Sequence, residues 1–240
     1  MADRVARRSL LWPTLWSIFG LLLLLGLGTW QVQRLHWKEG LIAERNAALA
    51  APPVPLPQTL DAARPLEFHP VRAEGQFLND RELYLNAQSL AGEQGFHVLT
   101  PFRLDDGAIL MVDRGFVPTE KQAPATRAQG QIAGPTTVIG LLRLPEAPGW
   151  FTPPNEPQKN SWFSIDLEAM AEAAGVGSAL PFYVDAAKTP PNPGGWPLGG
   201  QTITDLPNDH LQYAITWYAL AVALVVIYIR FAQRRLRSDS

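Results

Sequence analysis

The sequence has 240 residues, a formal net charge of −2 and no cysteine, and 47% of its residues are hydrophobic. A near-neutral chain without a long basic run argues against nucleic acid as a partner. The lack of cysteine excludes disulfides, thiolate metal sites and covalent c-type haem attachment, because all of these need a thiol. Much of the apolar content lies in two blocks near the ends, which favours a modest domain held by membrane anchors.

The first apolar block predicts a transmembrane helix over residues 10–30, a stretch without charge that is long enough to cross a bilayer. Secretory signal peptides have shorter apolar cores and end at an Ala-x-Ala-like cleavage site, which is missing here, so we expect an uncleaved anchor. The pair Arg7-Arg8 is also found in twin-arginine export signals, but charges that orient a first membrane helix are the commoner explanation.

The second apolar block predicts a transmembrane helix over residues 210–229. Arginines precede the first block and follow the second: Arg4, Arg7, Arg8, Arg230, Arg234, Arg235 and Arg237. The positive-inside rule therefore places residues 1–9 and 230–240 in the cytoplasm and residues 31–209 on the opposite side of the membrane.

Between the blocks, the sequence predicts a β-rich domain. The first helix is expected to continue past its membrane segment until Pro52 stops it, because proline lacks the amide donor and clashes with the preceding turn. Strand-like runs bounded by turn residues follow, namely residues 71–78, 82–86, 96–104, 109–117, 137–144 and 182–186. Asp106-Gly107 between two of these runs predicts a hairpin, and Pro101 before it indicates an edge strand or a bulge.

Two other segments complete the expected architecture. Residues 145–160 are rich in Pro, Asn and Gly and contain Trp150 and Phe151, which predicts a loop with aromatic anchors. Residues 164–175 predict a short helix. We therefore expect a membrane-anchored α+β fold, in which two transmembrane helices flank an antiparallel β-rich extracytoplasmic domain with one or two short helices.

Motifs for common enzyme chemistry are missing from the sequence. It has no Gly-x-Ser-x-Gly turn, no His-x-x-x-His or Glu-x-x-His pair and no phosphate-binding glycine loop. A hydrolase on anchors would thus lack a nucleophile and a base, and we expect no catalytic residues. Asp113 and Arg114 are expected in an internal ion pair or a turn, with a contact role for Arg114 as the alternative. His69 and His97 are expected to be hydrogen-bonded structural histidines.

His210 begins the second predicted membrane helix at its outer interface. The positive end of the helix dipole favours neutral imidazole there, whereas Asp205 and Asp209 favour the charged form. Tyr213 and Trp217 follow at spacings that share one helix face with His210, as expected of an axial haem ligand beside a porphyrin-stacking wall. An ordinary interfacial histidine explains the same residues, and from these residues alone it is the commoner case.

Two motifs lie at the outer ends of the predicted membrane helices: Gly28-Thr-Trp-Gln-Val-Gln-Arg34 and His210-Leu-Gln-Tyr-Ala-Ile-Thr-Trp-Tyr218. Segments between them include Ile109-Leu-Met-Val-Asp-Arg-Gly-Phe-Val-Pro118 and Phe182-Tyr-Val-Asp-Ala186. With these motifs the chain resembles the Surfeit locus protein 1 family, the assembly factors of haem-copper cytochrome c oxidase. The resemblance covers nearly all of the chain outside its termini.

The resemblance implies a non-enzymatic role, in which the protein binds haem a near the outer membrane face and helps it reach subunit I of the oxidase. It implies a bacterial inner membrane location with the central domain in the periplasm, and haem a synthase and membrane lipid as further partners. His210 matches the family's candidate iron ligand. Trp30, Gln31 and Arg34 match the family's sequence pattern and lie at the same membrane level, so we expect them as pocket neighbours, and the Arg34 guanidinium suits a haem propionate.

A different class of function remains open, namely a cofactor-free scaffold that stabilises subunit I during assembly. Copper delivery is not expected, because the chain has no cysteine and only three methionines, so the soft ligands that hold Cu(I) are missing.

Overall fold

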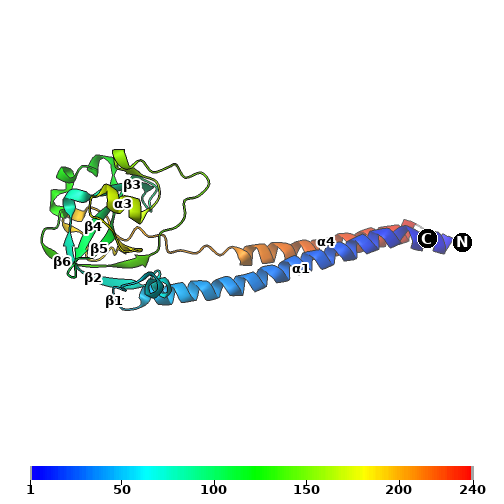
Figure 1. Ribbon diagram of the computed structural model, residues 1–240. Helices are drawn as coiled ribbons and strands as arrows, with labels where there is room; N and C mark the ends of the chain where they lie inside the picture. Colours follow the sequence, from blue (N-terminus) through cyan, green and yellow to red (C-terminus); the bar gives the residue numbers. More distant parts are fainter. Residues whose placement is uncertain (1, 239–240) are drawn as a thin grey trace. The chain divides into compact units, whose positions relative to one another are not determined.

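The computed structural model describes residues 2–238, with side chains for residues 10–237. The chain divides into a helical unit, residues 1–44 and 205–240, and a β unit, residues 45–204; Figure 1 labels their elements. Met1 and residues 239–240, which belong to the expected cytoplasmic ends, lie outside the described part of the chain. The side chains of Arg4, Arg7 and Arg8, which were expected to orient the first helix, also lie outside it.

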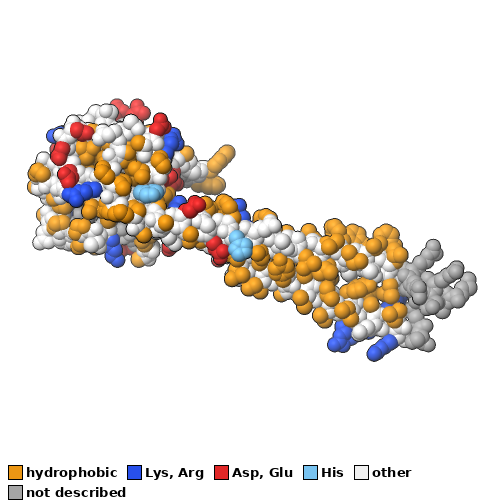
Figure 2. Space-filling view, turned by 90° about the horizontal axis from the view of Figure 1, so that it is seen from below, with side chains coloured by type: hydrophobic (Ala, Val, Ile, Leu, Met, Phe, Trp, Pro, Cys, Tyr) orange, Lys and Arg blue, Asp and Glu red, His pale blue; other side chains and the backbone are white. Residues whose placement is uncertain are grey.

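The helical unit is built from α1 (Ala2–Ala50) and α4 (His210–Ser238). The prediction that the first helix continues past residue 30 is confirmed, and the helix ends just before Pro52, where a missing amide donor prevents another turn. Both helices are long and apolar enough to cross a membrane, and almost none of their most apolar residues is buried by protein. Figure 2 shows hydrophobic side chains over much of the visible face of this unit.

Small residues let α1 and α4 approach closely as an antiparallel pair. Gly28, Ala214 and Ala221 are buried between them, as is typical of packed membrane helices, where small side chains bring the backbones together. At the other end of the pair, the hydroxyls of Thr14 and Tyr228 lie 2.5 Å apart. These contacts fix which faces of the two helices meet.

The β unit has eight strands: β1 (Val54–Pro55), β2 (Pro70–Phe77), β3 (Leu83–Gln88), β4 (Gln94–Leu104), β5 (Ile109–Pro118), β6 (Pro135–Arg143), β7 (Ser161–Trp162) and β8 (Tyr183–Ala186). Its helices are α2 (Leu60–Ala63) and α3 (Leu167–Ala173). Short 3-10 turns cover Arg64–Leu66, Asn79–Arg81, Thr119–Lys121, Pro124–Gly130, Pro157–Lys159 and Pro193–Gly195. The predicted strands and the short helix are confirmed; the two-residue strands β1 and β7 were not predicted.

The strands close into a small barrel. The sheet runs β1-β2-β6-β8-β5-β4-β3-β7, and an additional β2–β4 pairing joins its two halves. β4 makes this closure possible because it pairs with β3 up to Leu99 and with β2 from Phe102 onward, so that Pro101 lies where its neighbour changes. A bulge between His97 and Leu99 precedes this change. Gly75 lies at the β2–β4 seam, where a Cβ atom would collide with the Arg103 carbonyl oxygen.

The expected purely antiparallel arrangement is wrong in part. Most pairings are antiparallel, but β8 runs parallel to β5, as β1 does to β2 and β7 to β3. The physical reason is the long excursion between β5 and β8: parallel neighbours need a crossover connection, and β8 enters between β5 and β6 after such a crossover.

Two hydrophobic clusters form the core. β2 alternates buried and exposed residues, and its inward side chains join Phe102, Val112 and Phe182 in the barrel interior. A second cluster outside the barrel wall packs α3 through Met170 against the fully buried Trp162. This packing gives the β unit a core of its own, independent of the helical unit.

Candidate functional site

The first candidate site lies where α4 begins beside α1. Nδ1 of His210, the first residue of α4, lies 2.7 Å from Oε1 of Gln31. Gln31 is buried although it is polar, whereas His210 is partly exposed. A buried amide oxygen needs a donor, so Gln31 holds the proton of the imidazole on Nδ1.

This hydrogen bond sets what the rest of the imidazole can do. In a neutral ring with its proton on Nδ1, Nε2 carries a free lone pair, which is the atom that binds a metal. Ligating histidines usually donate their other ring N–H in this way, which orients the ring and fixes its tautomer. The His210–Gln31 pair therefore has the arrangement of an oriented ligand.

The residues next to Gln31 hold the two helices together at this level. A Cβ atom on Gly28 would lie 2.8 Å from the Tyr218 ring, so only glycine leaves room for that ring. The hydroxyls of Thr29 and Tyr218 lie 3.1 Å apart. Within four consecutive residues, the Gly-Thr-Trp-Gln motif thus supplies the space for the Tyr218 ring, a hydrogen bond to the Tyr218 hydroxyl and an acceptor for His210.

The other predicted site residues make no polar contact with His210 among those described. Trp30 and Tyr213 are each 54% exposed, and Trp217 is partly buried. Arg34 is exposed and its guanidinium lies 3.7 Å from the centre of the Trp37 ring. Of the six residues expected at the haem site, His210 and Gln31 are in direct contact. The rings of Trp30, Tyr213 and Trp217 are at least partly exposed on the surface of the helical unit.

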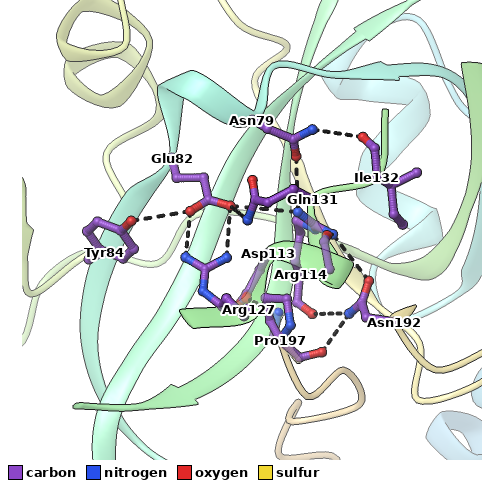
Figure 3. Close-up of polar contacts among 12 residues, drawn as sticks. Asn79, Glu82, Tyr84, Asp113, Arg114, Arg127, Gln131, Ile132, Asn192 and Pro197 are labelled. Carbon is purple, nitrogen blue, oxygen red and sulfur yellow. Dashed lines mark hydrogen bonds and ion pairs between the residues drawn. The ribbon is translucent and has the colours of Figure 1, made fainter. Parts of the chain in front are cut away.

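A second candidate is the buried polar network of the β unit, shown in Figure 3. Glu82 binds Arg127 through two hydrogen bonds of 2.6 and 3.0 Å, and it also accepts from Gln131 at 3.0 Å and from the Tyr84 hydroxyl at 3.2 Å. The carboxylate and the guanidinium are both almost fully buried. Burial, followed by the charge of Glu82, raises the pKa of Tyr84 to about 12.

Arg114 belongs to this network and does not pair with Asp113. Its guanidinium lies 3.7 Å from Glu82, donates to Asn79, to Asn192 and to the Gly130 carbonyl, and lies over the Phe77 ring. Burial lowers its pKa to about 10. The internal ion pair expected of Arg114 is therefore formed with Glu82. Since this network is enclosed by the barrel and its 3-10 turns, we assign it a structural role.

A third group of polar side chains ties the two ends of the β unit to one ion pair. Arg45, near the end of α1, lies 3.7 Å from the centre of the Phe68 ring, and Arg143 lies 4.4 Å from the same centre. Nη1 of Arg143 is 3.3 Å from Asp185, which accepts a 2.8 Å hydrogen bond from Thr202. Arg45 and Thr202, near the two ends of the β unit, thus contact Phe68 and Asp185, and Arg143 contacts both of these residues.

The carboxylates at this place are crowded. Asp113 on β5 faces Asp185 on β8 in parallel register. Burial, together with the charge of Asp113, raises the pKa of Asp185 to about 7. Burial alone would lower the pKa of His97, but Asp113, 2.5 Å from its Nδ1 atom, raises it above the ordinary value. His97 is therefore a hydrogen-bonded structural histidine, as predicted.

Comparison with known proteins now decides the family. The model of the SURF1 family matches residues 18–222, which include the His210–Gln31 contact and the whole of the β unit. The chain belongs to the SURF1 family. Its relatives include Surfeit locus protein 1 of Mus musculus, 42% identical over 225 residues that cover 88% of this chain and 72% of the mouse protein. The human Surfeit locus protein 1 is 42% identical over 221 residues, which cover 85% of this chain and 72% of the human protein.

A more distant relative, the SURF1-like protein of Drosophila melanogaster, is 35% identical over 228 residues, or 88% of this chain and 74% of the fly protein.

The sequence analysis named both residues of the His210–Gln31 contact, but it did not identify the partners of Glu82. A charged residue at the start of an apolar strand was the one available signal, because Glu82 precedes Leu83-Tyr-Leu85. Nothing local to the sequence pairs it with Arg127, 45 positions away.

Proposed function

We propose that this SURF1-family chain is a non-enzymatic assembly factor for haem-copper cytochrome c oxidase, which binds haem a near the outer membrane face and assists its insertion into subunit I. Haem a is thus its cargo. Subunit I is the proposed recipient, and haem a synthase is the proposed source. The proposed site consists of His210 as iron ligand, with Gln31, Trp30, Arg34, Tyr213 and Trp217 around it.

The His210–Gln31 hydrogen bond carries this proposal. It leaves Nε2 as the free ring nitrogen of a partly exposed histidine at the start of α4. The half-exposed rings of Trp30 and Tyr213 offer apolar surface for a porphyrin face. Arg34 keeps the N–H edge of its guanidinium free for a propionate while its face stacks on Trp37. The residues present therefore fit a haem held by one axial histidine.

The proposed location is the bacterial inner membrane, crossed by α1 and α4. We place residues 1–9 and 230–240 in the cytoplasm and residues 31–209 in the periplasm. The lipid-like surface of both helices supports this, because a core helix of a soluble protein would be mostly buried. The basic residues that follow the apolar part of α4 support a cytoplasmic end.

The structure also supports a second candidate, a scaffold without haem, because the His210–Gln31 bond joins two helices whether or not iron is bound. His210→Asn separates the two functions. An asparagine amide can still donate to Gln31 from nearly the same place, but it is a poor haem ligand.

The test is complementation of a strain that lacks this gene. Haem a insertion predicts that His210→Asn restores little oxidase activity and little haem a in subunit I, whereas His36→Asn, a change of an exposed histidine on α1, restores both. Full restoration by His210→Asn would overturn the haem role and leave the scaffold.

A further inference from the structure

The loop between β6 and β7 presents two aromatic side chains that contact almost nothing in the protein. Trp150 is 100% exposed and Phe151 is 98% exposed. The other exposed aromatic rings among the described side chains lie on α1 and α4, whereas these two lie on the β unit. Fully exposed Trp and Phe side chains are costly in water and mark an interaction surface.

The loop is built to present them. The amide of Thr152 donates to the Gly149 carbonyl at 3.0 Å, so Trp150 and Phe151 occupy the two central positions of a tight turn. Pro148 precedes this turn and Pro153-Pro154 follows it, and each proline fixes its own φ. Figure 1 shows the segment as a long loop, coloured between green and yellow, that stands away from the barrel.

Both roots of the loop are pinned to the domain. At the first root, Arg143 pairs with Glu146 at 2.9 Å. At the second root, the Asn155 side-chain oxygen accepts from the amides of Phe163 and Ser164 at 2.8 and 3.0 Å, and its amide group donates to the Ser164 carbonyl. A pinned, proline-rich turn loses little conformational entropy when its tip is bound, which favours binding.

We propose that Trp150 and Phe151 insert into the headgroup region of the bilayer that the protein itself spans. This inference rests on the membrane anchoring proposed above. The β unit is joined covalently to α1 at one end and to α4 at the other, so a lipid surface is its permanent neighbour. Aromatic side chains, Trp above all, favour the membrane interface, where their rings are apolar and the headgroups are wet.

The chemistry of the tip favours lipid over a protein partner. Two aromatic side chains bury roughly 150–250 Å² each, which is below the ~800 Å² per partner of a specific protein interface. Residues 145–158 carry no Lys or Arg, and their charges are Glu146 and Glu156. Insertion is therefore driven by apolar contact alone, and it needs neither anionic lipid nor low salt.

The experiment uses the full chain in phosphatidylcholine nanodiscs. Because the chain has no cysteine, Phe151→Cys, Val222→Cys and Asp105→Cys can each carry a single fluorescent label. Position 222 is exposed on α4 and reports membrane insertion, and position 105 lies in the exposed β4–β5 turn. The readout is quenching by nitroxide groups, which are attached to lipid headgroups for positions 151 and 105 and to lipid acyl chains for position 222, because position 222 lies inside the proposed membrane span.

We expect quenching at position 151 at least about threefold stronger than at position 105, because aromatic loop tips favour the headgroup level. Added Trp150→Ser should reduce this quenching and added Trp150→Phe should retain it, at both low and high salt. Quenching at 222 but not at 151 would overturn this inference and leave the anchoring intact. No quenching at 222 would overturn the anchoring and this inference with it. Shielding of 151 that requires added oxidase subunit I would overturn the lipid contact in favour of a protein contact.

Discussion

Nδ1 of His210 and Oε1 of Gln31 lie 2.7 Å apart and join the first turn of α4 to the buried face of α1. These two residues are 179 positions apart in the chain and come from the two motifs that carry the family resemblance. The contact explains both motifs at once: one supplies the imidazole, and the other supplies the acceptor that orients it together with the gap at Gly28.

Gln31→Leu should weaken haem binding by about 10–100-fold, the usual effect of removing a partner that orients a metal-binding histidine. Leucine keeps the size of the side chain but accepts no hydrogen bond, so the ring loses its fixed tautomer. Gln31→Glu keeps an acceptor and should bind haem close to the wild-type level, as should Gln33→Leu at an exposed position on α1. The measurement is a haem titration in detergent. Equal affinity for Gln31→Leu and wild type would show that Gln31 does not support the ligand.

Gly28→Ala should loosen the pairing of α1 and α4. The added methyl group would lie 2.8 Å from the Tyr218 ring, and overpacking of this kind costs about 1–3 kcal/mol. Gly26→Ala is the matched control, because a Cβ atom there has no neighbour within 4 Å. It should be neutral or slightly stabilising, since alanine is the better helix former. The check is the unfolding midpoint of each variant in mixed detergent, and equal midpoints for the two variants would contradict the close packing at Gly28.

Glu82→Gln should destabilise the β unit by about 3–5 kcal/mol, because removing the anion of a buried pair leaves the guanidinium of Arg127 without a counter-charge. Arg114 would lose its nearest carboxylate as well. Glu74→Gln removes a carboxylate from an exposed pair with Arg72 and should cost about 0–1 kcal/mol. Urea unfolding followed by near-UV circular dichroism compares the two. A cost below that of Glu74→Gln would show that the network does not stabilise the barrel.

The β unit should lose stability as the pH rises from about 4 to about 7. The pKa of Asp185 is raised to about 7 in the folded protein, so the folded state holds a proton that the unfolded state has already released. The raised pKa of His97 acts in the same direction, because stability gained from its proton is lost as the pH rises through the folded value. Asp113, Arg143, Thr202 and His97 are the groups that act on Asp185.

Asp185→Asn should flatten this dependence, because the amide never ionises while its oxygen can still accept from Thr202. Thermal unfolding between pH 5 and pH 8 measures the effect. Asp61→Asn on the exposed surface is the control and should leave the slope unchanged. An unchanged slope in Asp185→Asn would assign the pH dependence to another group.

The sequence predicted the strands and the hairpin well because these depend on local patterns. β2 alternates inward and outward residues, and Gly107 supplies the positive φ of the β4–β5 turn. Closure of the barrel was not predictable in this way. It depends on β4 changing partners near Pro101 and on β8 entering between β5 and β6, and both are long-range pairings without a local signal.

The candidate site was predictable only as far as its motifs extend. His210 and Gln31 were named from the sequence, but their direct contact needs the two helices to be packed in register. Arg114 shows that proximity in sequence can mislead. Its sequence neighbour Asp113 pairs with His97, whereas Arg114 itself pairs with Glu82, which directly precedes β3. Adjacent residues of a strand point to opposite faces, so a pair that is adjacent in sequence seldom forms an ion pair within a strand.

The most direct test of the haem a role is the visible spectrum of the detergent-purified protein from a host that makes haem a, recorded for wild type and His210→Asn. We expect Soret and α bands in the wild type that are lost in His210→Asn, although this variant keeps the wild-type unfolding midpoint. A colourless wild type, or equal bands in both proteins, would contradict the haem a role.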